Sequence, residues 1–105
     1  MQKKVEDFNK SLNIHKIQMP VSARLLDISS ELGELNKEFL KATKYGTQNF
    51  EVTKDFILEY GDVLYALLSL ENETNIDANT ALEKVLKKYE ARKNKSNSIG
   101  SESNI

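Results

Sequence analysis

Residues 56–70 read FILEYGDVLYALLSL, and eleven of these fifteen residues are apolar or tyrosine. The apolar residues recur every three or four positions, which predicts a helix from about Thr53 to Glu71. They form two neighbouring stripes: Phe56, Tyr60, Val63, Leu67 and Leu70 in the first, and Ile57, Leu64 and Leu68 in the second. A helix that is apolar around most of its circumference is expected at the centre of a helical protein.

A second apolar series precedes this segment and predicts a helix from about Val21 to Tyr45. Its members are separated by three and four residues in turn, a heptad-like pattern suited to packing on another helix. Pro20 suits the first turn of such a helix, and Gly46 follows where a left-handed residue commonly ends one. Residues 47–52 then form a connector. The series consists of Leu25, Ile28, Leu32, Leu35, Phe39 and Ala42.

Two shorter helices are expected on either side, one from Lys3 to Leu12 and one that follows the capping residue Asp77 and ends at about Arg92. The last 13 residues, KNKSNSIGSESNI, are rich in Ser and Asn and predict a disordered tail over 93–105. We therefore expect a single all-α domain over 1–92, with three to four helices, a central antiparallel helix pair and completion by oligomerisation. The buried face of the last helix is expected to comprise Ala81, Leu82, Val85, Leu86 and Tyr89.

The composition excludes several classes of site. The 105 residues include no Cys and one His, His15, so one chain cannot form disulfides, thiolate zinc sites or multi-histidine centres. Any metal site must use oxygen ligands, which favours Mg²⁺, Mn²⁺ or Ca²⁺. The net charge of −1 indicates no general attraction to nucleic acid or anionic membranes. No signal peptide is visible, and residues 56–70 are too short and too charged to span a bilayer, so we expect a cytoplasmic protein.

Two pairs of carboxylates form the candidate site. Glu31 and Glu34 are three residues apart in one predicted helix, so they share a helix face. Glu59 and Asp62 have the same spacing in the next helix, where they interrupt the apolar pattern. No basic residue lies between positions 54 and 84 to offset their charge if they are buried. A divalent cation bound by oxygen ligands would supply the missing counter-charge.

A glycine directly precedes the second acid of each pair, Gly33 before Glu34 and Gly61 before Asp62. Glycine inside a helix costs about 1 kcal/mol relative to alanine. Its repeated placement therefore suggests that a backbone or a ligand approaches closely there. Taken singly, the first pair is compatible with a solvated helix face and the second with a structural network. The two pairs together favour a metal site.

Three strings carry a likeness to a known family: ELGEL at 31–35, EYGDVLYAL at 59–67 and NIDANTALEKVLKKYEAR at 75–92. They resemble the signature of the MazG-like all-α nucleoside triphosphate pyrophosphohydrolases, over about residues 21–92. The resemblance implies a helical core whose sites are completed in a homodimer or homotetramer. It also implies cleavage of a nucleoside triphosphate to monophosphate and pyrophosphate, with Mg²⁺ held by four acids, Glu31, Glu34, Glu59 and Asp62.

Two positions depart from the family pattern. Ser30 stands where many members carry a further acid that is thought to help activate water, and Tyr89 replaces an Asn in the closing Lys-Asn-x-x-Arg string. A carboxylate that metal does not saturate can accept the proton of the attacking water. Glu34 and Glu38 are the candidates for this role.

The last predicted helix carries a basic line with four-residue spacing, formed by Lys84, Lys88 and Arg92. This line is either a solvated face or a contact surface for the triphosphate. Two further functions remain open: a specialised relative, such as a dCTP, dUTP or phosphoribosyl-ATP pyrophosphatase, and a non-catalytic helical interaction module. The interaction module would use the apolar series from Leu25 to Ala42 as its working surface, and Mn²⁺ is an alternative to Mg²⁺ in the enzyme.

Overall fold

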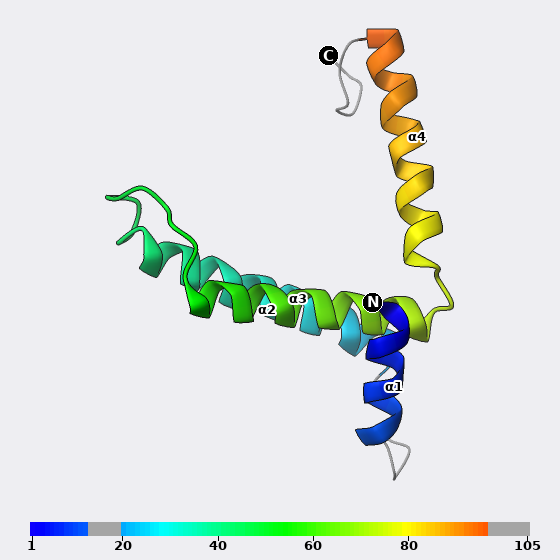
Figure 1. Ribbon diagram of the computed structural model, residues 1–105, viewed down its shortest axis with the longest axis horizontal. Coiled ribbons are helices and arrows are strands. Elements are labelled where there is room, and N and C mark those ends of the chain that lie inside the picture. Colours follow the sequence, from blue (N-terminus) through cyan, green and yellow to red (C-terminus); the bar gives the residue numbers. More distant parts are fainter. Residues whose placement is uncertain (13–19, 97–105) are drawn as a thin grey trace. The chain divides into compact units, whose positions relative to one another are not determined.

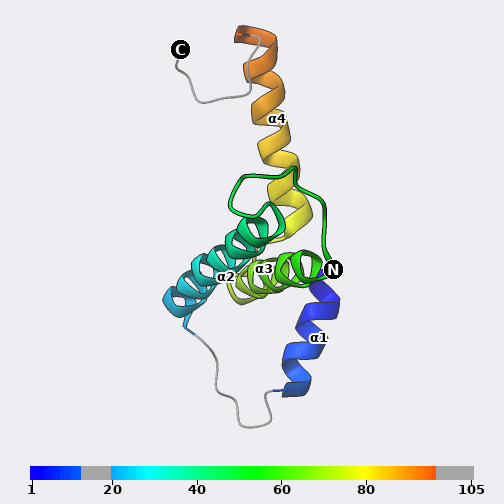
Figure 2. The same ribbon diagram turned by 90° about the vertical axis from the view of Figure 1, so that its left-hand side faces the viewer.

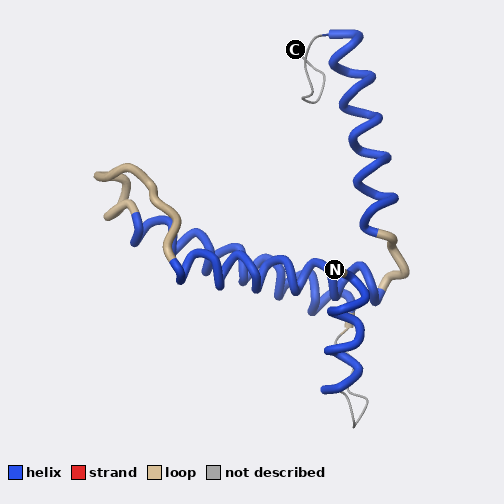
Figure 3. The backbone as a smooth tube through the Cα atoms, in the orientation of Figure 1, coloured by secondary structure: helices blue, strands red, loops and turns tan. Residues whose placement is uncertain are grey.

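The computed structural model describes residues 1–12 and 20–96, and these residues form four helices and no strand (Figures 1 and 3). The helices are α1 (Gln2–Leu12), α2 (Val21–Ala42), α3 (Lys54–Glu73) and α4 (Ala78–Ser96). The expected all-α class is thus confirmed for the described residues. His15 lies outside them. None of these helices combines the length and the apolarity that a bilayer span requires.

The chain divides into two compact units. The first, Met1–Asn75, contains α1, α2 and α3, and the second, which begins at Ile76, contains α4. The expectation of a single domain over residues 1–92 stays a prediction.

Side-chain caps set the starts of the last two helices. The Thr53 hydroxyl accepts a hydrogen bond from the Phe56 backbone N–H at 3.0 Å, so α3 begins at Lys54. The Asp77 carboxylate accepts from the backbone N–H groups of Asn79 and Thr80, at 2.9 and 3.3 Å. Each cap satisfies backbone donors that have no partner within the helix. The predicted cap at Asp77 is therefore confirmed.

The prediction that α2 extends to Tyr45 is wrong, because the helix ends at Ala42. The next residue, Thr43, is 1% exposed; its hydroxyl donates to the Phe39 carbonyl and accepts from the Gly46 N–H, both at 3.0 Å. Lys44 and Tyr45 already have positive φ angles, 48° and 58°, before Gly46 at 86°. The left-handed turn expected at the glycine therefore begins two residues earlier, held by the Thr43 side chain.

The other two long helices continue beyond their predicted ends. The helix α3 extends to Glu73, and α4 extends to Ser96 instead of about Arg92. Residues 93–96, expected in the disordered tail, belong to α4. The rest of the predicted tail, 97–105, lies outside the described residues.

Within the first unit, α2 and α3 lie side by side in both views (Figures 1 and 2). At one end of the pair, the Arg24 guanidinium contacts the Glu73 carboxylate with an N···O distance of 3.1 Å. At the other end, the Phe50 ring of the connector lies between two helical rings. Its centroid is 5.1 Å from that of Phe39 and 4.9 Å from that of Phe56.

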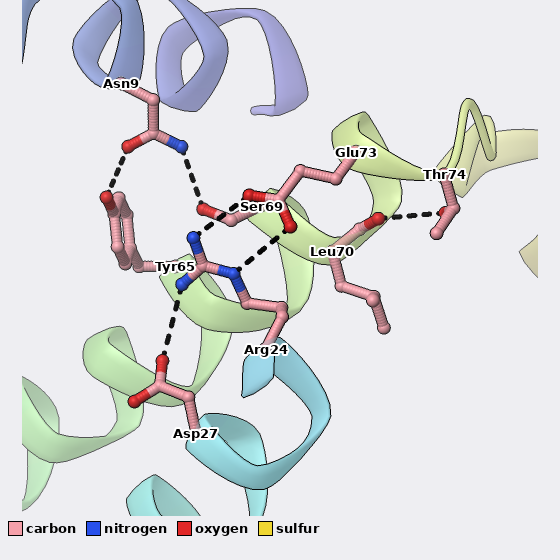
Figure 4. A network of polar contacts seen from close by, with 8 residues as sticks. All are labelled: Asn9, Arg24, Asp27, Tyr65, Ser69, Leu70, Glu73 and Thr74. Atoms are coloured by element: carbon pink, nitrogen blue, oxygen red, sulfur yellow. Dashed lines mark hydrogen bonds and ion pairs between the residues drawn. The ribbon is translucent and has the colours of Figure 1, made fainter. Parts of the chain in front are cut away.

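The short helix α1 packs on α3 mainly through polar side chains. Asn9 donates to the Ser69 hydroxyl at 3.0 Å and accepts a hydrogen bond from Tyr65 (Figure 4). Phe8 makes an edge-on contact with Tyr65, with ring centroids 6.1 Å apart. No described residue of α1 is buried, so α1 covers one side of α3 without being enclosed itself.

The apolar core of the described chain is small. Ala66 and Leu68, both in α3, are the buried apolar residues among those described. Part of the apolar surface of α3 is open within the described chain, since Ile57 and Tyr60 are 58% and 57% exposed, and the expected completion by oligomerisation stays a prediction. The predicted buried face of α4 is likewise open or half-buried: Ala81, Leu82 and Leu86 are exposed, and Val85 and Tyr89 are half-buried.

Enlarging Ala66 should open the contact between α2 and α3. Ala66 is 1% exposed and shares a helix face with Glu59 and Glu73, each seven residues away. Ala66→Leu should therefore lower the free energy of unfolding by about 1–3 kcal/mol, measured by urea denaturation. The matched control is Ala91→Leu at an exposed position of α4, with an expected change within about 0.5 kcal/mol. Equal stability of the two variants would contradict this packing.

Candidate metal centre

Three of the predicted site carboxylates converge between α2 and α3. One oxygen each from Glu31, Glu59 and Asp62 lies within 4.8 Å of the other two. Glu31 and Glu59 are half-buried and Asp62 is exposed, so the group lies at the surface with one side open. Mg²⁺ binds oxygen at about 2.1 Å, which places ligand oxygens up to about 4.2 Å apart. Small side-chain rotations would therefore bring all three onto one ion.

Helical periodicity explains why these side chains meet. In α2, Arg24, Glu31 and Glu38 are seven residues apart, which is close to two helical turns, so they share one face. Glu59 and Glu73 are separated by twice that spacing in α3. Since Arg24 contacts Glu73, the face of α2 that carries the glutamates is turned toward α3.

Two carboxyls of the group, those of Glu31 and Glu59, have a raised pKa. Burial raises the pKa of Glu31, and the nearby charges of Asp62, Asp27 and Glu34 raise it further. Burial also raises the pKa of Glu59, followed by the charges of the neighbouring carboxylates, of which Asp62 has the largest effect. Like charges at this distance favour either a bound proton or a bound cation. The group therefore has the charge and the donor atoms of a divalent-cation site.

Glu34, the fourth predicted ligand, is not one of the three carboxylates that lie within 4.8 Å of one another. Its side chain is half exposed and forms a 3.7 Å ion pair with Lys37 on the same helix. Its charge still contributes to the raised pKa of Glu59, so it lies within electrostatic reach. A change of Glu34 rotamer away from Lys37 would be needed for it to bind the same ion.

Glu38, the other candidate for activating water, is half-buried. Its carboxylate accepts a 3.2 Å hydrogen bond from Lys41, and 16% of its side chain is exposed. Glu38 is therefore not a freely solvated surface residue, and its charge also raises the pKa of Glu59. Both candidates for the base are thus held by a lysine one turn along α2 and lie near Glu59.

The two helical glycines are not explained by chain packing. Apart from the adjoining residues and backbone of its own helix, a methyl group built on Gly33 or Gly61 would have no atom of the described chain within 4 Å. Close approach of another backbone segment is therefore excluded as their cause within the described chain. Approach of a ligand stays a prediction.

The predicted phosphate contacts belong to the second unit. Lys88 and Arg92 flank the Tyr89 ring on α4, with the ammonium nitrogen and the guanidinium carbon 5.8 and 5.9 Å from the ring centroid. Lys84 is exposed on the same helix. Their contact with a triphosphate stays a prediction.

Sequence reasoning missed two ionisable residues of α2 and α3, Arg24 and Glu71. Arg24 is 8% exposed and contacts both Asp27 and Glu73. The seven-residue interval between Arg24 and Glu31 was the available signal, because it places the two on one helix face. Glu71 was also missed; burial raises its pKa, and its Oε1 atom has no hydrogen-bond partner among the described residues.

Comparisons of the chain with protein-family models, with curated proteins and with solved structures found no match. The resemblance to the MazG-like enzymes therefore rests on the motif residues themselves. The geometry defines a group of three carboxylates from two helices, with two further carboxylates near it.

The raised pKa values predict how stability depends on pH. The folded chain holds protons on Glu31 and Glu59 more tightly than the unfolded chain does, so their contribution to stability is greatest at low pH. It is lost as pH rises from the usual glutamate range near 4.5 through the raised pKa values. Without metal, Glu59→Gln should therefore lose less stability than the unmodified chain between about pH 4 and pH 7.

Thermal melts in the presence of a chelator measure this difference. Glu83→Gln, at an exposed position of α4, is the matched control and should follow the unmodified chain. Identical pH profiles for all three proteins would show that the carboxylates do not repel one another in the folded state.

Proposed function

We propose that the protein is a Mg²⁺-dependent nucleotide pyrophosphohydrolase that converts a nucleoside or deoxynucleoside triphosphate to monophosphate and pyrophosphate. The observation that carries the proposal is the convergence of Glu31, Glu59 and Asp62, from two helices, to within 4.8 Å. These residues belong to the strings that resemble the MazG-like family. The substrate class comes from that resemblance, and the oxygen donors are compatible with it.

The proposed ligands are Glu31, Glu59 and Asp62, with Glu34 as the fourth after it leaves Lys37. When bound, Mg²⁺ would neutralise charge on the phosphate oxygens. Three carboxylates this close together are suited to hold such an ion, because the cation removes their mutual repulsion.

The chemistry requires a water molecule to attack the α-phosphorus. The new P–O bond forms as the bond from phosphorus to the α–β bridging oxygen breaks, and pyrophosphate leaves with that oxygen. A carboxylate must accept the proton of the water. We assign this role to Glu34 or Glu38, since both lie within electrostatic reach of Glu59 and neither belongs to the closest three carboxylates.

The basic line of α4 is proposed to contact the triphosphate. Lys84, Lys88 and Arg92 are each four residues apart and so share one side of the helix. Cationic side chains form charge-assisted hydrogen bonds with phosphate oxygens, and the arginine can do so through two N–H groups at once.

Self-association is part of the proposal, as a homodimer or a homotetramer with α2 and α3 as its central antiparallel pair. Large apolar side chains on both helices are open to solvent in the single chain. Leu25 and Leu32 of α2 are 52% and 45% exposed, and Ile57 and Leu67 of α3 are 58% and 40% exposed. A second copy would bury this surface, which a chain of this size cannot cover alone.

Specialised relatives of the same enzyme class act on dCTP, dUTP or phosphoribosyl-ATP and cleave the same α–β phosphate bond. Assaying a panel of substrates would distinguish them from an enzyme with a broader substrate range. A non-catalytic helical interaction module is the second candidate. It is favoured by the exposure of Leu25, Leu32 and Phe39, which lie at seven-residue intervals along α2. Such a module has no need for converging carboxylates, so metal dependence separates the two candidates.

Asp62→Asn should reduce pyrophosphate release by at least about 100-fold while leaving the helical content unchanged. The substitution removes an anionic oxygen from the proposed metal site but preserves the side-chain volume, and even residues that only orient metal ligands cost 10–100-fold when replaced. The assay follows pyrophosphate from a panel of nucleoside and deoxynucleoside triphosphates with millimolar Mg²⁺. Asp55→Asn, in the first turn of α3, is the matched control and should retain activity.

Two results of this assay would contradict the proposal. One is orthophosphate as the first product, and the other is full activity of Asp62→Asn. Absence of turnover across the panel, together with no Mg²⁺ or Mn²⁺ effect on the melting temperature, would favour the interaction module.

A further inference from the structure

The contact between α2 and α3 contains an unusual charged residue. Arg24 is the buried residue of α2, with 8% of its surface exposed. Its Nε and Nη2 atoms donate to the two oxygens of Glu73 at 3.4 and 3.1 Å, and Nη1 donates to Asp27 at 3.4 Å (Figure 4). The guanidinium therefore joins the start of α2 to the end of α3 through a two-point contact.

A two-point contact of this kind restricts how the helices can slide. Replacing a buried ion pair by apolar residues is often neutral or stabilising, so stability alone does not account for it. A guanidinium and a carboxylate match in one geometry, whereas leucine and alanine surfaces tolerate small shifts. A slip of one residue moves a helix by 1.5 Å and turns its contact face by about 100°, which would separate Arg24 from Glu73.

The same slip would disperse the carboxylate group. Glu31 follows Arg24 by seven residues on the same face of α2, and Glu59 precedes Glu73 by fourteen residues on the same face of α3. The contact at the helix ends thus sets which residues of the two helices stand opposite each other. The carboxylates themselves oppose this arrangement, because their charges repel at their distance of at most 4.8 Å.

We propose that Arg24 is a positioning residue for the carboxylate group: by binding Glu73 at two points, it holds α2 and α3 in the register that brings Glu31 to Glu59 and Asp62. The inference rests on the proposed function in so far as that group binds a divalent cation. The effect of Arg24 on the register of α2 and α3 does not itself depend on metal.

Two measurements test the proposal separately. The chain has no cysteine, so Ser29→Cys and Leu58→Cys place spin labels at exposed positions of α2 and α3, and dilution with unlabelled chain suppresses distances between copies. Pulsed electron resonance then gives the distribution of distances between the two helices. Mn²⁺ binding to the unlabelled variants is measured by the loss of the free-ion resonance signal.

Arg24→Met should broaden the distance distribution and weaken Mn²⁺ binding by about tenfold or more, as loss of a residue that orients metal ligands does. Arg24→Met combined with Glu73→Leu should recover most of the melting temperature, because the one carboxylate that loses its partner, Asp27, is 33% exposed to solvent, but it should not recover the narrow distribution or the Mn²⁺ affinity. Arg24→Lys should recover part of the narrow distance distribution and part of the Mn²⁺ affinity. Lysine keeps the positive charge but lacks the planar guanidinium that donates two parallel hydrogen bonds. Lys3→Met removes charge from an exposed ion pair within α1 and is the matched control.

A double variant with unchanged distance distribution and unchanged Mn²⁺ affinity would overturn the proposal, since Arg24 would then be merely structural. If the unmodified chain binds no Mn²⁺, the proposed function fails. The distances between the spin labels on α2 and α3 then decide by themselves whether Arg24 sets the register of the two helices. Broadening in Arg24→Met supports the claim in that case, and an unchanged distribution overturns it.

Discussion

Electrostatic repulsion between α2 and α3 is the constraint on which the other features of the first unit depend. Glu31 on one helix and Glu59 and Asp62 on the other bring three carboxylate oxygens within 4.8 Å. The apolar core of the described residues has two buried members, Ala66 and Leu68, both in α3. Contacts at the two ends of the α2–α3 pair offset this repulsion, and they differ in kind.

One end is held by charge and the other by aromatic packing. The Arg24 guanidinium binds Glu73 where α2 begins and α3 ends. At the opposite end the Phe50 ring of the connector lies between Phe39 and Phe56. Between these two ends the carboxylates face each other with one side open to solvent. The arrangement leaves three carboxylate oxygens close together, and oxygen atoms are the ligands that Mg²⁺ and Ca²⁺ prefer.

Elements that depend on local interactions were predictable from the sequence. The existence of four helices follows from apolar periodicity, and the Asp77 cap follows from the side chain's own reach to the next backbone N–H groups. The end of α2 was not predictable in this way. A threonine in a helical pattern gives no sign that its hydroxyl will bind the Phe39 carbonyl and the Gly46 N–H and end the helix before the glycine.

The candidate site also combines features that the sequence indicates with features that depend on contacts between residues far apart in the sequence. Acid pairs at a spacing of three residues indicated four candidate carboxylates, and the structure brings three of them, Glu31, Glu59 and Asp62, together. The separate position of Glu34 depends on its ion pair with Lys37, and the role of Arg24 depends on Glu73, 49 residues away. The Arg24–Glu73 pair arises from the packing of two helices, so the periodicity of one helix does not reveal it, whereas the Glu34–Lys37 pair lies within α2. The exposure of apolar side chains on α3 likewise reflects what surrounds the helix, not its own pattern.

The location of bound Mn²⁺ on the chain tests whether Glu31, Glu59 and Asp62 form a divalent-cation site. In nuclear magnetic resonance spectra of the isotope-labelled chain, substoichiometric Mn²⁺ broadens the backbone amide signals nearest to the ion. We expect the signals around Glu31, Glu59 and Asp62 to broaden first, and excess Mg²⁺ to restore them by competition. Broadening centred on other acidic residues, or no selective broadening at all, would contradict the assignment of this carboxylate group as a divalent-cation site.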